Sequence, residues 1–390
     1  MKILHAVESY PPVQSGMAEV CRQISERLVQ AGHEVTVVTT KIHERKESEL
    51  NGVKVRQFNV SGNYVRGMQG EIDEYISFIK SIDFDIVTFF AAQTWTTDLA
   101  LPYLKEIKGK KVFVPTGFSG LHFPAYRKYY KQMIDRLKEF DNNIFLSNDY
   151  RDINYAKKNQ VTNYIIIPNG ADGTEFLSDS DINFRYLYKI PEDDFMILHV
   201  GSRTGFKGHT EALDIFRKAK IKNSTLVMIG NSASGLYSSL MKYFNFKLKR
   251  FNADKTNKAN NKQILILNTS RSETVSAFKQ ADLFLFPSNI ECSPLVLFES
   301  MAGKTPFLVT DVGNSKEIVE WTNGGIILPT KKCFGLSRAK LSQSAKILEN
   351  IFNNPELRKT MAALGFKAWS EKFTWEKIAK KYEELYSSLL

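Results

Sequence analysis

The order strand, glycine-containing turn, helix, strand occurs twice in this chain. The first copy occupies about residues 2–39, and the second occupies about residues 195–229. Two parallel strands can be joined only through a crossover of a dozen or more residues, which is usually a helix. Each copy is therefore the beginning of a parallel sheet. The fold class predicted from this pattern is α/β, with two successive units of similar size.

Further short apolar runs extend each unit. We predict strands at 53–58, 86–90, 111–114, 143–146 and 164–167 in the first unit, and at 265–267, 283–286 and 306–310 in the second. The polar stretch 171–192 separates the two sets and is predicted to be a linker. A second stretch, 247–262, carries six basic residues against one acidic residue and is expected to be an exposed insertion.

Composition excludes several classes of protein. With 390 residues, of which 43% are hydrophobic, the chain can bury two cores and is not intrinsically disordered. It has no uninterrupted apolar run of 18 residues, so no membrane-spanning helix is expected. Glu8 interrupts the N-terminal apolar segment, which is unlike a signal peptide, and the cytoplasm is the predicted compartment. The net charge of +11 favours anionic partners of some kind, but does not choose among nucleic acid, anionic lipid and phosphorylated substrates.

The segment 287–303 is the strongest functional signal. It follows a predicted buried strand, so its loop should lie at the carboxyl end of that strand, where parallel sheets bind ligands. We predict that Ser293 caps the next helix and that Pro294 is its first residue. Glu291 then lies in the loop and Glu299 lies in the helix, near amides that can bind phosphate. The alternative is an ordinary strand–loop–helix segment with two incidental carboxylates.

The amino-acid sequence of this segment resembles that of a known protein family. Glu291, seven further residues and Glu299 are similar to the E-x7-E motif of the retaining GT4-type glycosyltransferases. Similar wording continues in Thr310-Asp311-Val312-Gly313, in Pro168-Asn169-Gly170 and in Phe373-Thr374-Trp375-Glu376. The resemblance implies the GT-B fold, with two Rossmann-like domains facing a cleft. It implies an acceptor-side domain at 1–172, a donor-nucleotide domain at 173–372, and a C-terminal helix, 373–390, that crosses back to the first domain.

The same resemblance implies roles for residues on the donor side. Glu299 would bind the ribose of the donor, and Glu291 would hold the transferred sugar. Basic groups must stabilise the charge that grows on the departing diphosphate, a role that the resemblance gives to Lys207 and Arg203. Further donor contacts are expected from Gly16, Ser293, Pro294, Leu295 and Val296.

The acceptor side is expected around Thr116 and His122, where the chain departs from the family's usual Thr-x-His wording. We predict no catalytic metal, because helix N-termini and basic side chains handle the phosphate charge. The sequence Asp83-Phe84-Asp85 is interpreted as a turn before a buried strand and not as a metal-binding motif. A basic, aromatic helix at 123–140 is expected either to pack its aromatic stripe into the domain or to rest on anionic lipid.

Together these features predict a metal-independent retaining hexosyltransferase without a cofactor. Its co-substrate would be a UDP- or GDP-linked sugar, and its acceptor a saccharide or a lipid-linked saccharide of cell-surface polysaccharide assembly. The enzyme would be cytoplasmic, with peripheral contact at the inner face of the membrane through 123–140, and would bind no nucleic acid. Two alternatives stay open: a sugar-nucleotide epimerase on the same fold, and a non-catalytic partner protein.

Overall fold

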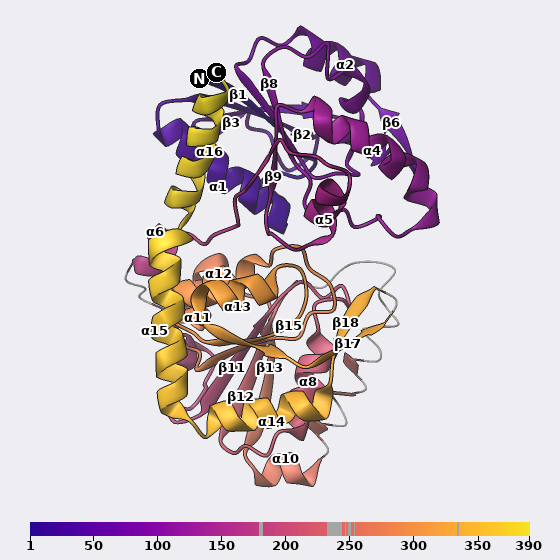
Figure 1. Cartoon of the computed structure of the whole chain (residues 1–390). Coiled ribbons are helices and arrows are strands. Elements are labelled where there is room, and N and C mark those ends of the chain that lie inside the picture. Colours follow the sequence, from indigo (N-terminus) through magenta and orange to yellow (C-terminus); the bar gives the residue numbers. More distant parts are fainter. Residues whose placement is uncertain (179–181, 232–243, 246, 249–250, 253, 334) are drawn as a thin grey trace. The chain divides into compact units, whose positions relative to one another are not determined.

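A computed structural model describes residues 1–178, 182–231, 244–245, 247–248, 251–252, 254–333 and 335–390. The chain forms two compact units (Figure 1). Unit 1 contains Met1–Asn169 and Trp375–Leu390, and unit 2 contains Gly170–Thr374. Each unit is an α/β domain around its own sheet.

Unit 1 is built on an eight-stranded sheet in the order β10-β9-β8-β7-β1-β2-β4-β3. All neighbouring strands are parallel except the β3–β4 pair at one edge. A separate hairpin, β5–β6, follows β4. The strands are β1 (Lys2–Ala6), β2 (Glu34–Thr40), β3 (Glu49–Leu50), β4 (Val53–Phe58), β5 (Val60–Asn63), β6 (Gly67–Gly70), β7 (Ile86–Phe90), β8 (Lys110–Val114), β9 (Asn142–Phe145) and β10 (Tyr164–Ile166).

The helices of unit 1 include one that comes from the far end of the chain. They are α1 (Gly16–Gln30), α2 (Ile72–Ser81), α3 (Trp95–Asp98), α4 (Arg127–Glu139), α5 (Arg151–Lys158) and α16 (Trp375–Leu389), with short 3₁₀ turns η1 (Leu101–Tyr103) and η2 (Pro124–Tyr126). The α16 helix packs on α1, and the Tyr386 hydroxyl lies 2.7 Å from Thr88 Oγ1 and 3.1 Å from His5 Nε2. Buried hydrogen bonds to β1 and β7 therefore fix this C-terminal helix to the N-terminal sheet.

Unit 2 is built on a six-stranded parallel sheet in the order β13-β12-β11-β14-β15-β16. A hairpin, β17–β18, follows it. The strands are β11 (Phe195–Val200), β12 (Ser224–Ile229), β13 (Lys262–Leu267), β14 (Leu283–Phe286), β15 (Phe307–Thr310), β16 (Gly325–Leu328), β17 (Thr330–Cys333) and β18 (Leu336–Ala339). Its described helices are α6 (Gly173–Leu177), α7 (Phe184–Leu187), α8 (His209–Lys218), α10 (Lys255–Ala259), α11 (Arg271–Gln280), α12 (Leu295–Ala302), α13 (Ser315–Thr322), α14 (Leu341–Phe352) and α15 (Pro355–Lys372).

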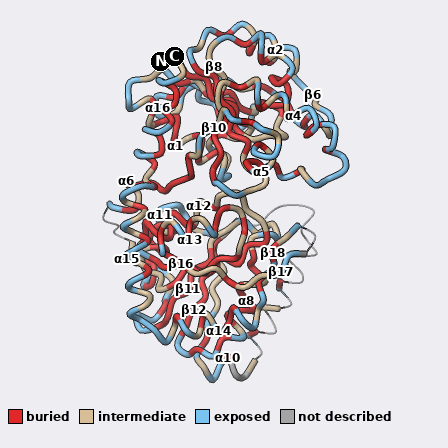
Figure 2. The backbone as a smooth tube through the Cα atoms, viewed as in Figure 1, coloured by how far each residue is buried: buried red, intermediate tan, exposed pale blue. Residues whose placement is uncertain are grey.

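The central strands are buried on both faces in each unit, as Figure 2 shows. In unit 2 one apolar cluster contains Leu198, Phe284 and Phe298, and a second, on the other face of the sheet, contains Ile197 and Leu285. Alternate residues of β11 and β14 thus enter opposite cores, because side chains alternate along a strand. The predicted architecture of two Rossmann-like domains is confirmed. The strands predicted at 53–58, 86–90 and 283–286 have the observed bounds, and the second copy begins with the strand β11 at 195 and ends with β12 at 229, as predicted.

The division between the units lies slightly away from its predicted places after 172 and 372. The Ala171 N–H donates to the Phe373 carbonyl at 3.0 Å, and the Trp369 indole donates to the Ala171 carbonyl at 3.3 Å. Unit 2 begins at Gly170 and ends at Thr374. The prediction of a linker at 171–192 is also wrong. Two helices, α6 and α7, lie in this segment and bury Phe176 and Phe184 in the core of unit 2.

The expectation that 247–262 is an exposed insertion is wrong for Phe251, Asn257 and Lys262, which are buried. Residues 249, 250 and 253 of this segment lie outside the described residues. Lys262 is buried as the first residue of β13. Its ammonium donates to the Ala219 carbonyl at 2.9 Å and lies over the Phe216 ring, and burial lowers the pKa of Lys262 to about 8. A lysine that satisfies its donors on backbone carbonyls can be buried despite its charge.

Among the described residues, no helix is both long and apolar enough to cross a membrane.

Candidate active site

The strand order of unit 2 reverses between β11 and β14. From β11 the chain proceeds outward through β12 and β13, then returns to place β14 on the other side of β11. Loops from adjacent strands diverge at such a point, which leaves a crevice at the carboxyl ends of the strands. Lys207 follows β11 and Glu291 follows β14, so both predicted catalytic residues lie at this reversal.

Lys207 and Glu291 are in direct contact. The Lys207 ammonium lies 2.8 Å from each carboxylate oxygen of Glu291. The Ser288 hydroxyl also donates to Glu291 Oε1 at 2.8 Å. The Glu291 side chain is 9% exposed and that of Lys207 is 31% exposed, so the pair is half-sheltered from water. The arrangement presents a positive charge beside a fixed carboxylate, so an anionic group and hydroxyl groups of one ligand could be bound side by side.

Backbone contacts hold the loops after β11 and β14 against each other. The Asn289 N–H donates to the Phe206 carbonyl at 2.8 Å. Gly208 has φ +80°, and a Cβ at this position would lie 2.1 Å from the Pro287 carbonyl oxygen. Only glycine allows this approach. The position of Lys207 relative to Glu291 therefore depends on Gly208.

The helix after Glu291 begins later than predicted. Pro294 is the N-cap residue of α12 and Leu295 its first residue, while no side chain caps the helix. The prediction of Ser293 as N-cap is therefore wrong. The Ser293 hydroxyl instead accepts a hydrogen bond from Asn314 Nδ2 at 3.2 Å. Leu295 and Val296 lie in the first turn, where backbone N–H groups are available to an anion.

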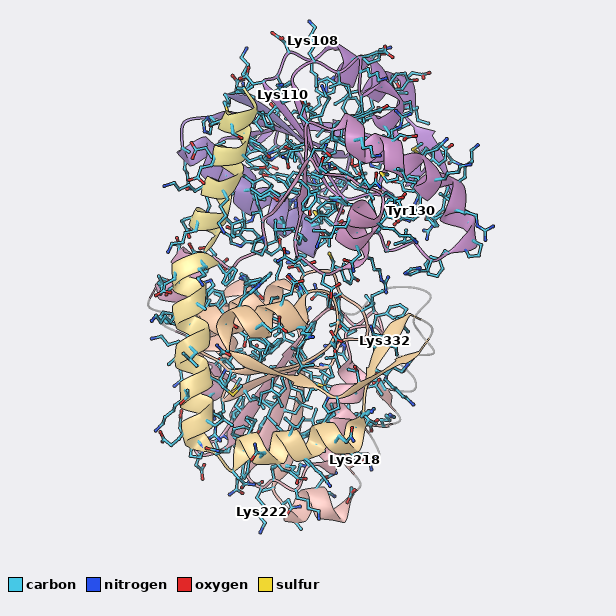
Figure 3. All side chains as sticks on the ribbon, viewed as in Figure 1. Lys108, Lys110, Tyr130, Lys218, Lys222 and Lys332 are labelled. Atoms are coloured by element: carbon cyan, nitrogen blue, oxygen red, sulfur yellow. The ribbon has the colours of Figure 1, made fainter. Side chains whose placement is uncertain are left out.

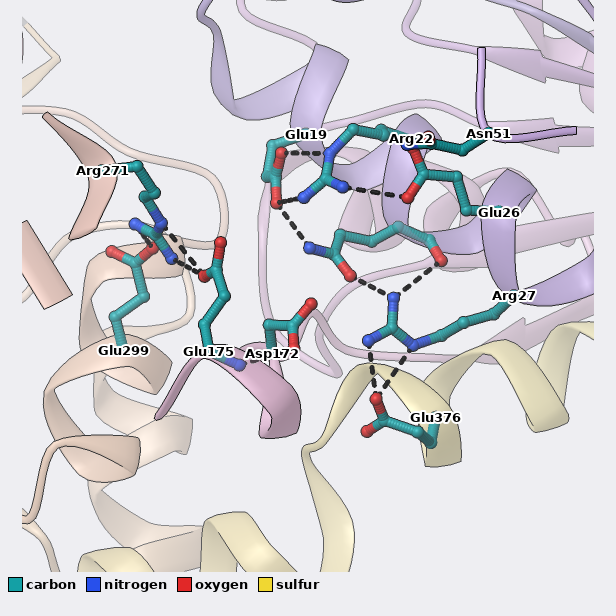
Figure 4. Close-up of polar contacts among 11 residues, drawn as sticks. Glu19, Arg22, Glu26, Arg27, Asn51, Asp172, Glu175, Arg271, Glu299 and Glu376 are labelled. Atoms are coloured by element: carbon teal, nitrogen blue, oxygen red, sulfur yellow. Dashed lines mark hydrogen bonds and ion pairs between the residues drawn. The ribbon is translucent and has the colours of Figure 1, made fainter. Parts of the chain in front are cut away.

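Glu299 belongs to an ion cluster that sequence reasoning missed (Figure 4). It lies in α12 with its side chain 11% exposed, and Arg271 Nη1 is 2.6 Å from its Oε1. Arg271 also contacts Glu175 Oε2 at 2.6 Å through Nη2. A capping box, Ser270 with Glu273, begins α11 and places Arg271 at the carboxyl end of β13. One guanidinium thus orients the carboxylate that is predicted to bind ribose.

Arg203 lies at the same edge of the sheet. Its Nη2 donates to the Leu267 carbonyl at 3.1 Å and its backbone N–H donates to the Asn231 carbonyl at 3.0 Å. Burial lowers the pKa of Arg203 from its ordinary value. The guanidinium therefore lies at the end of β13, and its catalytic role stays a prediction.

Two buried imidazoles come from β11 and α8, the two elements that the Lys207 loop joins. The rings of His199 in β11 and His209 in α8 are 4.4 Å apart, and His199 Nδ1 lies 2.9 Å from the Leu285 carbonyl oxygen. Burial lowers the pKa of His199 to about 4 and holds the pKa of His209 well below its ordinary value. Both rings are therefore neutral around pH 7.

This pair predicts acid sensitivity in unit 2. Below about pH 6.5 histidines of the unfolded chain take up protons and buried His199 does not, so stability should fall as pH drops from 6.5 towards 4. A His199→Gln variant should lose less stability than wild type between pH 7 and pH 5, by about 2 kcal/mol for one group. Comparison of the Tm of both proteins at the two pH values checks this. Equal losses in the two proteins would contradict it.

In unit 1, the corresponding reversal of strand order lies between β1 and β7. Gly16 is the exposed first residue of α1, after the N-cap Ser15, and Thr116 follows β8. His122 is exposed in the loop before η2. These three predicted residues belong to unit 1, whereas the Lys207–Glu291 pair belongs to unit 2.

Unusual backbone conformations cluster in the loops after β7 and β8. Ala91, Gln93, Thr116 and Phe118 all have φ between +46° and +69°. Non-glycine residues in this region cost free energy and concentrate at functional sites. The Gln93 side chain holds the two loops together, because its Oε1 accepts from Ser119 Oγ at 2.9 Å and from the Gly120 N–H at 3.1 Å. Gln93 was not predicted, because no sequence motif reports a positive φ at a non-glycine residue.

A buried carboxyl lies near these loops. Asp98 accepts from the Tyr129 hydroxyl at 2.8 Å and from the Tyr64 N–H at 2.9 Å. Burial raises the pKa of Asp98 to about 6, and burial together with the Asp98 charge raises the pKa of Glu8. Glu8 lies just beyond the carboxyl end of β1. Neither acid was assigned a role from the sequence, because 90 residues separate them in the chain and the charge of one acts on the other only in the fold.

The α4 helix packs its aromatic stripe inward. Tyr129, Tyr130 and Met133 are each 4% exposed or less and belong to the core of unit 1. The aromatic stripe therefore packs into the domain, which is one of the two alternatives stated for 123–140. The side chains left outside include Phe123, 61% exposed, and the basic residues Arg127, Lys128 and Lys131.

The chain bends at Asp85 directly before β7, and the Asp85 carboxylate accepts from the Lys2 N–H at 2.7 Å. This bond joins the start of β7 to the start of β1. Within the described part of the chain, no group of three or more His, Cys, Asp or Glu side chains is placed to hold a metal ion.

Two family models match the chain, one in each half. Residues 14–175 match the model described as Glycosyltransferase Family 4, and residues 182–365 match the model described as Glycosyl transferases group 1. Together they span both predicted site regions.

Individual proteins similar to this chain include glycosyltransferases. An uncharacterized glycosyltransferase of Methanocaldococcus jannaschii is 25% identical, over 99% of this chain and 98% of its own length. The capsular polysaccharide biosynthesis glycosyltransferase CapM of Staphylococcus aureus is 24% identical, over 61% of this chain and 58% of its own. Among solved structures, Anabaena HepE in complex with UDP superposes with a TM-score of 0.77 at 16% identity, covering all of both chains.

Proposed function

Because this chain belongs to the family 4 glycosyltransferases with the GT-B fold, we propose that it transfers a hexose-type sugar, with retention of configuration, from a nucleoside diphosphate sugar to a hydroxyl. The observation that carries the proposal is the contact of Lys207 with Glu291 at the strand reversal of unit 2. A charge of each sign is held there, one suited to a diphosphate and one to sugar hydroxyls.

In this proposal, the donor lies along the carboxyl edge of the unit 2 sheet. Its ribose hydroxyls donate to Glu299, which Arg271 orients. Its diphosphate lies at the N-terminus of α12, where Leu295 and Val296 offer backbone N–H groups. Lys207 donates to the same diphosphate, and Glu291 accepts hydrogen bonds from the transferred sugar. The structure of HepE, a structural relative, contains UDP, which supports uracil as one candidate for the base of the donor nucleotide.

The proposed reaction is a same-face substitution. As the glycosidic bond to the diphosphate breaks, negative charge grows on the leaving oxygen, and the Lys207 ammonium and the helix amides stabilise it. The acceptor hydroxyl attacks from the same face, and a diphosphate oxygen takes its proton. This assignment needs no metal, since the cations and amides of unit 2 meet the charge. No further cofactor is proposed.

The acceptor is proposed to be a saccharide or lipid-linked saccharide of polysaccharide assembly, in agreement with the named process of the relative CapM. We place its site in the unit 1 loops around Thr116 and His122, where the positive-φ residues gather. Peripheral contact with an anionic inner membrane surface stays part of the proposal. The buried stripe of α4 changes the residues concerned, which become Phe123 and the exposed basic residues of α4.

A thermal-shift screen against UDP- and GDP-sugars tests the donor class, because a ligand of the folded state raises Tm. The matching sugar nucleotide should then release its nucleoside diphosphate when saccharide acceptors are added. A change in the sugar nucleotide itself without acceptor would favour an epimerase instead. Donor binding without turnover across many acceptors would favour a non-catalytic partner.

A Glu299→Gln variant should bind the nucleoside diphosphate at least tenfold more weakly than wild type. The amide keeps the size of the side chain but loses the charge that Arg271 orients, and each tenfold change in affinity corresponds to about 1.4 kcal/mol. Titration calorimetry measures the affinity. Glu320→Gln on α13, an exposed residue of the same unit, makes the same charge change away from the site. Equal losses in both variants would remove Glu299 from the nucleotide site.

A further inference from the structure

Unit 2 contains a charged cavity whose lining does not include the Lys207–Glu291 pair. Its volume is about 570 Å³, within the usual range for sites of small ligands. It is lined by one side of α8, by the β17–β18 hairpin and by the beginning of α14. The proposed transfer reaction uses none of these lining residues.

Basic side chains dominate the lining. The five are Lys218, Lys247, Lys331, Arg338 and Lys340, and the lining includes only two acidic residues. Asp214 is paired with Lys247 and lies 3.8 Å from Arg217, and Glu211 lies 3.5 Å from Arg338.

Three lysines remain after these pairs are counted. Within the part of the chain that the structure describes, the ammonium groups of Lys218, Lys331 and Lys340 have no hydrogen-bond or ion-pair partner. They come from three different elements, α8, β17 and the residue before α14, and converge on one cavity. Like charges held in one concave site repel each other and favour an anion that neutralises them.

The start of α14 adds donors to the same cavity. Leu341, Ser342 and Gln343 form its first turn and line the cavity. The N-cap position is Lys340, no side chain caps the helix, and the first turn carries no acidic residue. The first backbone N–H groups of a helix have no acceptor within it, and the helix dipole favours negative charge there.

We propose that this cavity binds a soluble phosphate-bearing ligand that carries at least two negative charges. Phosphate oxygens can accept from lysine ammonium groups and from helix amides together, a combination that a single carboxylate would use only in part. The lysines are exposed, but they and the first turn of α14 line one cavity, and a concave lining of this kind favours a small anion over a flat membrane surface.

The cavity is connected to the donor loop. Glu211 Oε1 lies 3.5 Å from Arg338 and accepts from Asn289 Nδ2 at 3.2 Å. Asn289 follows β14 in the loop that carries Glu291, and its carbonyl accepts from the Ser337 N–H at 2.9 Å. An anion that draws Arg338 away from Glu211 would change the partner that holds Asn289. Occupancy of the cavity should thus alter donor affinity, and donor binding should alter anion affinity by the same factor.

The test measures binding of inorganic pyrophosphate by titration calorimetry at 150 mM salt. A Lys207→Met background weakens competing binding at the donor site, so the assay does not depend on sugar transfer. Adding Lys331→Ala and Lys340→Ala should weaken pyrophosphate binding about tenfold or more. The control pair, Lys332→Ala with Lys346→Ala, removes the same charge from β17 and from α14, outside the cavity lining, with Lys332 labelled on the hairpin in Figure 3. The control should bind as the background does.

Two results would overturn the proposal. Equal weakening by both pairs would show that only overall charge attracts pyrophosphate. Vesicles containing phosphatidylglycerol form the second arm of the test. If the cavity pair weakened vesicle binding while pyrophosphate binding stayed unchanged or absent, the site would recognise a lipid headgroup and not a soluble ligand.

Discussion

Replacement of Lys207 by methionine should lower kcat for sugar transfer about a thousandfold, with a smaller effect on KM. Methionine keeps most of the length and the apolar stem of lysine and removes only the charge. The ammonium lies 2.8 Å from both oxygens of Glu291, at the point where the diphosphate is proposed to depart. Its charge matters more as the bond breaks, so the loss should appear mainly in the rate. Steady-state kinetics with the donor identified by the screen measures both constants.

Stability separates the catalytic and structural effects of this change. Without Lys207, Glu291 keeps the hydrogen bond from Ser288 but loses its cation while only 9% exposed, so Tm should fall. The double variant Lys207→Met with Glu291→Gln should recover much of the Tm without recovering activity. Lys222→Met, a change at an exposed lysine of unit 2 (Figure 3), should leave both unchanged. If kcat returned together with Tm in the double variant, Lys207 would have only a structural role.

The sequence predicted the sheets well because their strands are buried on both faces. Uninterrupted apolar runs such as 195–200 and 283–286 have few other stable arrangements in a chain of this kind. β16 was missed because Gly325 is its first residue and Gly324 precedes it, which indicates a turn. A Cβ on Gly325 would lie 2.2 Å from the Phe307 ring, so that strand needs its glycine for packing against β15.

The site was only partly predictable. Lys207 and Glu291 were each identified from wording, but their contact depends on β14 pairing with β11 and not with β13. The cluster of Arg271, Glu175 and Glu299 joins three elements that carry no shared motif. Ser293 was assigned by a local rule for helix caps. A tertiary contact replaces the predicted cap, because the Ser293 hydroxyl accepts a hydrogen bond from Asn314 in the loop after β15.

A Gly208→Ala variant should lose about a hundredfold in kcat and unfold at a lower temperature than wild type. At φ +80°, any side chain costs about 1 kcal/mol in backbone strain. In addition, its Cβ would lie 2.1 Å from the Pro287 carbonyl oxygen and 2.4 Å from the carbonyl carbon. The loops after β11 and β14 must separate to relieve this contact. Lys207 and Glu291 lie on those two loops, and displacements of about 1 Å in a site can cost a hundredfold in rate.

Gly32→Ala is the matched control for this change. Gly32 has φ +89° in unit 1, and a Cβ there would meet nothing within 4 Å. It therefore carries the backbone cost without the steric contact, and should lower stability by about 1 kcal/mol while leaving kcat unchanged. Tm and kcat of the two variants separate the two effects. If Gly208→Ala matched Gly32→Ala in both quantities, the loops could adapt to a side chain, and the close approach at Pro287 would not be what positions Lys207 beside Glu291.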